Sequence, residues 1–365
     1  MIDCGFPVIE YDASDSPLEW GRQHGEEFRD AISELVEIRL GLMREKNPTL
    51  DPSIITNLAE QQWNATRDYD AELADELQGI CDGSGMSHEQ ITVLNNYTDF
   101  RDIQLADEQG CSVVYINFGS PIAGQTWDMH GSAKNYVNVM KVPGADGLTE
   151  TILFSLVGCL GMMGFSRYGT TLQVNNINTD GAVAAVMWPA IVRKTLQFPS
   201  QERMTQHLQL ANVTSGHNYL IASEDRAEMW EVMPGLADCA SSIDGGEEGY
   251  LLHTNHCFGH SAVNRETKIS QNSTTYIRYD LLTKKIDSVK DYQALYALLN
   301  DHENYPKSIC SNFQTDSQDP SITCGGAIGD LTTGRIEMWR GDEVYDANFV
   351  KHEFQLDIRR DEGVS

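Results

Sequence analysis

The sequence has few positive charges and no long hydrophobic run. No stretch of 18 apolar residues occurs in the 365 residues, so no transmembrane helix is expected. Only 26 Lys and Arg residues oppose 54 Asp and Glu residues, which gives a formal net charge of −28. This charge repels phosphate backbones and anionic lipid headgroups, so neither nucleic-acid binding nor membrane binding is expected. The acidity indicates solubility or salt tolerance, with attraction of an amine-bearing substrate as the functional alternative.

Targeting and cofactor motifs are also missing. The first five residues lack the basic and apolar regions of a signal peptide, and the last four form neither a prenylation box nor a peroxisomal signal. Eight cysteines occur without a CxxC pair, so reduced thiols and, by elimination, a cytoplasmic location are expected. No P-loop, serine elbow, GxGxxG fingerprint or HExxH motif occurs, and no cofactor is expected.

Two kinds of hydrophobic pattern divide the chain. Helical periodicity predicts helices from Pro17 to about Asn47, from Pro52 to Asp82 and from Ser87 towards Leu105. From Cys111 onward, short apolar or alternating runs predict a sheet-rich body with helices interspersed. Strands are expected at 111–118, 123–128, 137–142, 151–157, 171–176, 218–222, 227–233, 250–254, 322–329 and 335–339, and helices at 182–197, 201–210, 275–285 and 292–300. The pattern indicates an α+β protein whose two antiparallel sheets are covered by helices.

The dipeptide Gly110-Cys111 opens the sheet-rich part and is the strongest candidate for chemistry. If the bond between them were cut, Cys111 would carry both a thiol nucleophile and a free α-amino group that could act as its base. Such an amino group has a pKa near 7.7–8.0, which suits proton transfer at neutral pH. The polar residues Asp107, Glu108 and Gln109 predict a flexible approach to this bond.

Asp128 and Asn255 are candidates to assist Cys111. A hairpin would bring Asp128 back beside Cys111, where its carboxylate could orient the freed amino group, although a turn or capping role is the alternative. Asn255, at a predicted strand end, could donate its side-chain amide to a developing oxyanion. Asn175 and Asn176 are candidates for a second donor, or belong to an ordinary turn.

The segment around Asn255 also raises the question of a metal site. His253, His256 and Cys257, with His260 after them, are residue types that bind zinc. However, alternation along a strand would send His253 and His256 to opposite faces, so we expect no metal there.

Several motifs, taken in order, resemble the family of acyl-coenzyme A:6-aminopenicillanic acid acyltransferase, also called isopenicillin N acyltransferase. They cover nearly the whole chain. The motifs are Gly21-Arg22-Gln23-His24-Gly25, Gly110-Cys111-Ser112, Gly124-Gln125-Thr126-Trp127-Asp128, Val174-Asn175-Asn176, His217-Asn218-Tyr219, His253-Thr254-Asn255-His256-Cys257, Glu303-Asn304-Tyr305-Pro306 and Ser308-Ile309-Cys310.

The resemblance implies an N-terminal-nucleophile fold of αββα layers, made as a precursor that is cut by its own cysteine. It implies Cys111 as nucleophile, Asp128 as the carboxylate that orients the amine, and Asn255 as an oxyanion donor. Residues 1–110 would form a helical pro-segment that stays as a small subunit, and residues 111–365 the catalytic large subunit. The substrate would be a small acyl-amide or an acyl-coenzyme A.

One departure from the family concerns an arginine. The family enzyme has an arginine shortly after its Ser-Ile-Cys motif, whereas residues 311–320 contain none. Arg278 or Arg335 could compensate, but the sequence places neither near Cys111. The sequence therefore predicts a self-cleaving amidohydrolase or acyltransferase, with a metal-dependent hydrolase using His253, His256 and Cys257, or a silent binding protein of the same fold, as alternatives.

Overall fold

The computed structural model describes residues 1–49, 51–104, 110–269, 273–312 and 319–359. The expected approach to the Gly110-Cys111 bond, Asp107 to Gln109, lies outside these residues, as does Leu105, the expected end of a helix. Among the described residues, no helix has the length and apolar character needed to cross a membrane.

The N-terminal region is helical, as the sequence predicts, but its helices are shorter than expected. The helices are α1 (Pro17–Glu27), α2 (Arg29–Lys46), α3 (Pro52–Tyr69), α4 (Ala71–Ser84) and α5 (His88–Gln104). The expected helix from Pro17 to Asn47 was wrong because Phe28 has non-helical dihedrals that separate α1 from α2. The expected helix from Pro52 to Asp82 was wrong because Asp70 is extended and its carboxylate caps α4 by accepting from Leu73 N–H at 3.0 Å.

The motif that begins at Gly21 makes two contacts: one between helices α1 and α4, and one between α1 and the loop after strand β5 (Thr149–Leu156). A Cβ atom on Gly21 would lie 1.9 Å from the carbonyl oxygen of Glu76, so only glycine permits this approach of α1 to α4. His24 follows on the same helix, and its Nε2 accepts from Gly158 N–H at 2.9 Å. Burial lowers the pKa of His24 to about 3, which keeps the ring neutral and able to accept.

Two sheets form the centre of the molecule. The eight-stranded sheet has the order β1-β4-β5-β6-β7-β8-β9-β10, and the six-stranded sheet has the order β11-β2-β3-β12-β13-β14. The strands of the first are β1 (Val8–Glu10), β4 (Val137–Pro143), β5 (Thr149–Leu156), β6 (Met163–Ser166), β7 (Thr170–Asn176), β8 (His217–Ala222), β9 (Arg226–Met233) and β10 (Leu236–Asp244). Those of the second are β2 (Gly110–Asn117), β3 (Pro121–His130), β11 (Gly249–His253), β12 (Ser321–Asp330), β13 (Arg335–Arg340) and β14 (Val350–Gln355).

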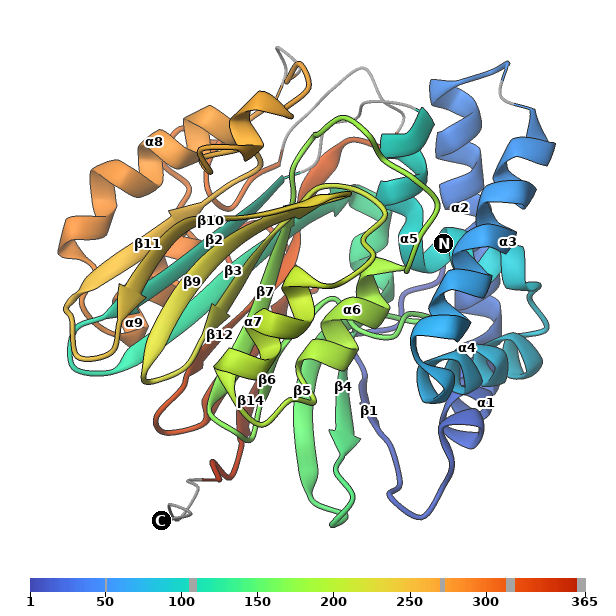
Figure 1. The fold of residues 1–365 in the computed structure, drawn as a ribbon, viewed down its shortest axis with the longest axis horizontal. Coiled ribbons are helices and arrows are strands. Elements are labelled where there is room, and N and C mark those ends of the chain that lie inside the picture. Colours follow the sequence, from blue (N-terminus) through green and yellow to red (C-terminus); the bar gives the residue numbers. More distant parts are fainter. Residues whose placement is uncertain (50, 105–109, 270–272, 313–318, 360–365) are drawn as a thin grey trace.

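Helices cover the outer faces of both sheets (Figure 1). Helices α8 (Thr275–Lys285) and α9 (Tyr292–Leu299) pack on the six-stranded sheet through a core that includes Val114, Leu282 and Leu295. Helix α7 (Gln201–Gln209) contacts β8 and β9 of the other sheet, and α6 (Trp188–Thr195) contacts both α7 and α5. Short 3₁₀ helices lie at Gly131–Tyr136, Ala262–Asn264 and Ile286–Ser288. The predicted α+β class and the αββα order of layers are confirmed.

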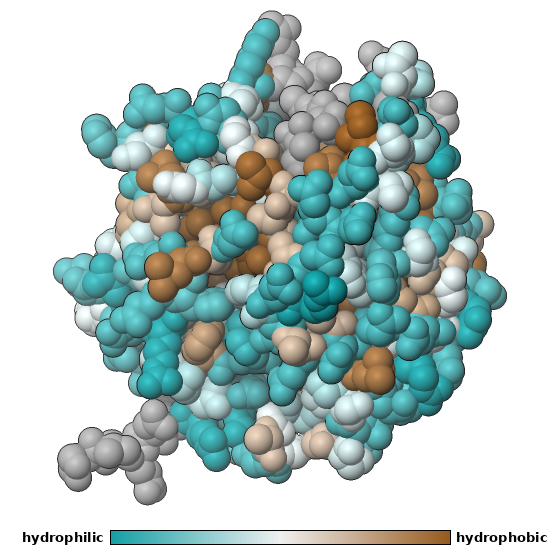
Figure 2. Space-filling view, turned by 45° about the vertical axis from the view of Figure 1, so that its right-hand side comes forward, coloured by the Kyte–Doolittle hydropathy of each residue, from teal (hydrophilic) through white to brown (hydrophobic). Residues whose placement is uncertain are grey.

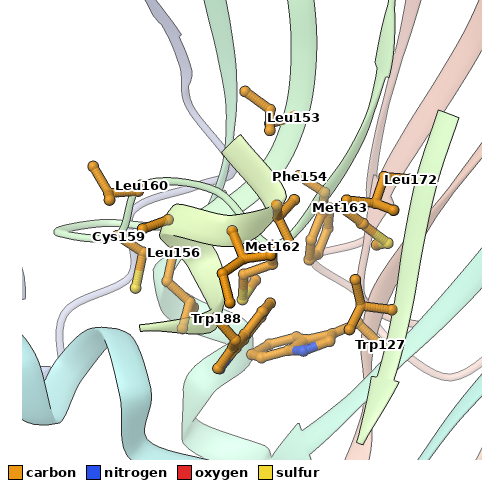
Figure 3. Close-up of a cluster of buried hydrophobic side chains, with 14 of the residues drawn as sticks. Trp127, Leu153, Phe154, Leu156, Cys159, Leu160, Met162, Met163, Leu172 and Trp188 are labelled. Carbon is orange, nitrogen blue, oxygen red and sulfur yellow. The ribbon is translucent and has the colours of Figure 1, made fainter. Parts of the chain in front are cut away.

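The main core fills the space between the two sheets and extends to the N-terminal helices. Figure 3 shows part of it, where Trp127 of β3 lies among residues that include Met162, Met163 and Trp188. On the surface, hydrophilic residues cover most of the face in Figure 2, and hydrophobic residues gather mainly in its upper half. The body therefore holds β2 and β3, which carry the candidate nucleophile, in a rigid and well-packed setting.

Candidate active site

The first two strands of the six-stranded sheet form the predicted hairpin around Cys111. Strands β2 and β3 are antiparallel, with Gly110 opposite Asp128 and Cys111 opposite Trp127. Side chains alternate along β2, so Cys111 belongs to the core between the sheets, while Val114 packs under α8 and α9. The thiol therefore lies on the inner face of the sheet, and the side chain of Asp128 lies towards α8.

The backbone of Cys111 is bound by side chains where β11 no longer pairs with β2. The register ends at His253 opposite Val113, so the outer edge of β2 has no strand partner at Cys111. Asn255 takes that place: its Oδ1 accepts from Cys111 N–H at 2.9 Å. Arg278 Nη1 donates to Cys111 C=O at 2.6 Å. Both backbone groups of the candidate nucleophile are thus satisfied by side chains.

The orientation of the Asn255 amide follows from its neighbours. Besides Cys111 N–H, its Oδ1 accepts from Arg278 Nη2 at 2.7 Å, and its Nδ2 donates to the carbonyl oxygen of Asn176 at 2.8 Å. A flipped amide would direct its NH₂ group at two donors, so this assignment is required. In the uncut chain Asn255 therefore holds Cys111 by accepting, and its own donor is engaged by Asn176.

The two other asparagines differ in their relation to Cys111. Asn175 Nδ2 donates to Thr254 C=O at 2.7 Å and lies 3.4 Å from Cys111 C=O. Asn218 Nδ2 donates to Asn175 Oδ1 at 2.8 Å and fixes its orientation. Asn176, in contrast, takes part through its backbone carbonyl, and its side-chain amide lies 3.4 Å from Gly216 C=O. Of the two, only the side chain of Asn175 is directed at Cys111.

Arg278 is the central cation of this site, and the sequence did not place it there. It lies on α8, is fully buried, and donates to Thr274 Oγ1 and Ser112 Oγ at 3.0 and 2.9 Å, in addition to Cys111 and Asn255. Burial lowers the pKa of Arg278, which the nearby Asp128 carboxylate opposes. Arg335 lies elsewhere, on β13, where it pairs with Glu337.

Asp128 faces Gly110 with one oxygen that accepts no hydrogen bond within the described chain. Its Oδ1 accepts from Thr323 Oγ1 at 2.7 Å, whereas Oδ2 is buried and lies 4.0 Å from Arg278 Nε. Burial raises the pKa of Asp128, while Arg278 and the hydroxyls of Thr323 and Thr126 lower it. The charge of Arg278 therefore compensates Oδ2 without a direct hydrogen bond from the described residues.

Gly110 is the residue that this carboxylate approaches. A Cβ atom on Gly110 would lie 2.3 Å from Asp128 Oδ2 and 3.1 Å from Arg278 Nη2. The first distance is well below any van der Waals contact, so only glycine fits opposite Asp128. The glycine of the Gly-Cys dipeptide therefore has a steric cause in the structure.

The surroundings of Cys111 favour the neutral thiol over the thiolate. Burial raises its pKa to about 12, with a further increase from the negative charge of Asp128, and Arg278 and the amide of Gln125 act in the opposite direction. Gln125 also joins the two sheets, because its amide donates to Val174 C=O at 2.5 Å and accepts from Val174 N–H at 2.7 Å. Sequence reasoning did not identify this role, since it depends on sheet packing.

The residues considered for a metal site are not brought together. His253 Nε2 lies 2.9 Å from Glu231 Oε1, and His256 Nδ1 lies 3.0 Å from Thr275 Oγ1. Cys257 N–H donates to Glu266 at 2.6 Å. Within the described ranges, the group of His, Cys and carboxylate ligands close enough to share an ion lies elsewhere and contains none of these residues. The three residues of the metal-dependent alternative are therefore not arranged as ligands of one ion.

Comparisons with known proteins identify relatives of this chain. The chain is 23% identical over 318 residues to the 40 kDa form of acyl-coenzyme A:6-aminopenicillanic-acid-acyltransferase from Emericella nidulans, an alignment that covers 82% of this chain and 83% of that protein. Similar solved structures include penicillin V acylase from Agrobacterium tumefaciens (12% identity, TM-score 0.44, 69% of this chain and 89% of that one). A conjugated bile acid hydrolase from Clostridium perfringens is also similar (10% identity, TM-score 0.36, 68% and 93%).

The family profile decides the assignment, because those structural similarities are too distant to bear on activity. The profile described as acyl-coenzyme A:6-aminopenicillanic acid acyl-transferase matches residues 117–338, which is more than half of the chain. The expected relationship to an enzyme family of acyl transfer is thereby confirmed. The chain belongs to the acyl-coenzyme A:6-aminopenicillanic acid acyl-transferase family.

Proposed function

We propose that this protein is a self-cleaving cysteine enzyme that hydrolyses or transfers an acyl group at an amide or thioester bond. The observation that supports it most directly is the arrangement at Gly110-Cys111. The dipeptide lies opposite a buried carboxylate, one oxygen of which accepts no hydrogen bond from the described residues, and Asn255 and Arg278 bind the backbone of Cys111. A cysteine held for structure alone would not need this convergence of polar side chains on its backbone.

Maturation follows as a shift of an acyl group from nitrogen to sulfur. Cys111 Sγ attacks the carbonyl carbon of Gly110, the carbon–nitrogen bond breaks, and the thiol proton passes to the departing nitrogen. The product is a thioester between Gly110 and Cys111 Sγ and a free amine on Cys111. Water then hydrolyses the thioester, which restores the thiol and gives Gly110 a carboxylate. Residues 1–110 become a small subunit and residues 111–365 the large subunit.

The mature site has an α-amino group that the uncut chain lacks. The nitrogen of Cys111 is bonded to Gly110. The strand register pairs Gly110 with Asp128, whose Oδ2 faces that glycine. That oxygen accepts a hydrogen bond from the new amine and orients it to take the thiol proton. Asn255 keeps its orientation because Oδ1 still accepts from Arg278, and the second hydrogen of its Nδ2 group is the proposed donor to a substrate oxyanion, beside Asn175.

The proposed substrate is a small acyl-amide or an acyl-coenzyme A ester. Cys111 lies on the face of β2 that packs into the core containing Trp127, so an apolar acyl group suits the side from which the thiol is approached. Water as acceptor makes the reaction a hydrolysis, and an amine as acceptor makes it a transfer. A cytoplasmic location, which would keep Cys111 reduced, stays a prediction.

Denaturing electrophoresis tests the maturation. Scaling the 40.7 kDa chain by 110 and 255 of its 365 residues predicts fragments of about 12 and 28 kDa. The Cys111→Ala variant stays as one full-length band, and the matched control Cys257→Ala, which removes a buried thiol outside the site, gives both fragments. Edman sequencing of the large fragment reads Cys-Ser-Val-Val. A single uncut band from the unmodified protein would refute self-cleavage.

Mass spectrometry tests the activity separately. Incubation of the mature protein with N-acyl amines, N-acyl amino acids and acyl-coenzyme A esters gives an acyl adduct on the large subunit, on the peptide that begins with Cys111. If cleavage occurs but no substrate of these classes leaves an adduct or is turned over, the acyl-transfer assignment fails. An intact Gly110–Cys111 bond with an unreactive thiol would instead indicate a silent binding protein.

A further inference from the structure

A second cluster of reactive side chains lies behind the candidate active site. His302 and Cys310 lie in the segment after α9, and Asp342 follows β13. One ligand atom from each lies within 4.8 Å of the other two, and in the described part of the chain no other His, Cys or carboxylate group of this size meets that condition. Segments separated by about thirty residues thus bring together one imidazole, one thiol and one carboxylate.

The hydrogen bonds in this cluster all converge on one oxygen. Asp342 Oδ2 lies 2.8 Å from His302 Nε2 and 3.6 Å from Cys310 Sγ, which donates to it. Two protons therefore point into the space between the three side chains. A metal-free site of protonated ligands has this arrangement, because a bound cation replaces those protons.

The carboxylate is held in place by the backbone that follows it. Asp342 Oδ1 accepts from Val344 N–H at 2.8 Å and from Tyr345 N–H at 3.2 Å, so Oδ2 alone is directed at the other two residues. Cys310 N–H donates to Asp301 C=O at 3.1 Å, which fixes the cysteine beside the residue that precedes His302. Such outer contacts orient ligands in metal sites and reduce the cost of assembling them.

We infer that His302, Cys310 and Asp342 form a binding site for a divalent transition-metal ion of the zinc type. Zinc takes nitrogen, sulfur and oxygen ligands at about 2.0–2.3 Å in a tetrahedron, which places ligand atoms roughly 3.3–3.6 Å from one another. The two separations that involve Asp342 Oδ2, 2.8 and 3.6 Å, are within about half an ångström of this geometry, and the ligand atoms of His302 and Cys310 lie within 4.8 Å of each other. His302 and Asp342 are partly exposed, so a water molecule has access to the fourth position.

Binding of the metal ion would change the protonation of Cys310 and His302. The Cys310 thiol loses its proton to solvent and binds as thiolate. His302 binds through Nε2, so its proton moves to Nδ1. Asp342 binds through Oδ2 and keeps its contacts through Oδ1. One proton is released for each ion bound, and no oxidation is involved.

The site is connected to Asp128 through the chain that follows Cys310. Ser311 N–H donates to Thr323 Oγ1 at 2.8 Å, and Thr323 Oγ1 donates to Asp128 Oδ1 at 2.7 Å. The ion would therefore fasten the segment that supports the carboxylate from behind. This role does not depend on Cys111 as nucleophile, so the two proposals fail independently.

Cobalt and zinc binding test the site. The purified full chain, in its Cys111→Ala form, is stripped with a chelator and titrated with Co²⁺ alone. We expect a thiolate-to-cobalt charge-transfer band in the near ultraviolet, and zinc retained at one ion per chain after gel filtration. Both are lost in Cys310→Ser and weakened at least tenfold in His302→Gln and Asp342→Asn, while the control Cys257→Ser keeps both. Asp342→Asn retains the oxygen that the backbone amides need, which guards against loss of folding.

Two kinds of result would contradict a metal site at His302, Cys310 and Asp342. A folded, stripped protein that takes up no zinc in competition with a weak chromophoric chelator would overturn it. A charge-transfer band unchanged in Cys310→Ser, or one lost in Cys257→Ser, would do the same. If Cys310→Ser does not fold, the titrations of the Cys111→Ala chain with and without His302→Gln decide between the outcomes.

Discussion

Substitution of Gly110 by alanine is the sharpest test of the proposed cleavage site. The added Cβ atom would lie 2.3 Å from Asp128 Oδ2, whereas ordinary van der Waals contact begins at 3.4 Å. Asp128 or the Gly110 backbone must therefore move by about 1 Å. A misplacement of about 1 Å in a catalytic arrangement costs roughly 10²-fold in rate, so we expect Gly110→Ala to cleave about a hundred times more slowly.

The assay is a time course of cleavage in precursor made by cell-free translation, with the fragments resolved by denaturing electrophoresis. An alanine carbonyl differs from a glycine carbonyl by one neighbouring methyl group, so its intrinsic reactivity toward a thiol cannot account for a loss of this size. Gly41→Ala is the control, because its Cβ atom meets nothing within 4 Å and it lies in α2. Cleavage of Gly110→Ala at the rate of Gly41→Ala would refute the steric argument.

Three further predictions concern the charges around Cys111. Arg278→Met removes a buried cation that faces Asp128 and should cost about 3–5 kcal/mol of unfolding free energy in denaturant titrations of the Cys111→Ala background; Arg335→Met, on the surface, should cost about 1 kcal/mol or less. Asp128→Asn should lower kcat of mature enzyme by about 10²- to 10⁴-fold with little change in KM, measured by steady-state kinetics. Because the pKa of Cys111 is raised to about 12 in the uncut chain, its thiolate fraction grows with pH throughout the neutral range. The cleavage rate of cell-free precursor should therefore rise roughly tenfold per pH unit from pH 6 to 9, and a plateau near pH 7 would contradict that pKa.

The parts of the fold set by local pattern were predictable from the sequence. Strand β2 begins within one residue of the expected start at Cys111, and the hairpin with β3 follows from alternation and a Gly-Ser-Pro turn. The sequence did not predict strands β1, β6, β10 and β14, which differ from the predicted strands in position or length. Three of them, β1, β10 and β14, lie at sheet edges, and β6 has four residues, so their strand structure is determined by neighbours rather than by their own sequence.

The candidate site also contains residues that a local sequence pattern could indicate and one residue, Arg278, that it could not. Cys111, Asp128 and Asn255 belong to short motifs, and a resemblance could indicate them. Arg278 lies in an amphipathic helix without any local signature, and its place depends on how α8 packs over β2. A signal did exist, since Arg278 is one of only 26 positive residues and lies at helical spacing from Leu281 and Leu282, on the side of α8 that is buried. A lone arginine on an apolar helix face indicates a buried anion or carbonyl nearby.

One oxygen of Asp128, Oδ2, accepts no hydrogen bond from the described residues, and this favours the proposed cleavage over its reversal. In the uncut chain this oxygen is buried opposite a glycine, which has no side-chain donor, and burial raises the pKa of the carboxyl group. Leaving such a group unsatisfied costs about 1–3 kcal/mol. The proposed cleavage would create an amine next to it, so the product would supply the hydrogen-bond donor that the uncut chain lacks. In the proposed mechanism the same carboxylate favours the cut state and then orients the base of the mature enzyme, so glycine, cysteine and aspartate act together rather than singly.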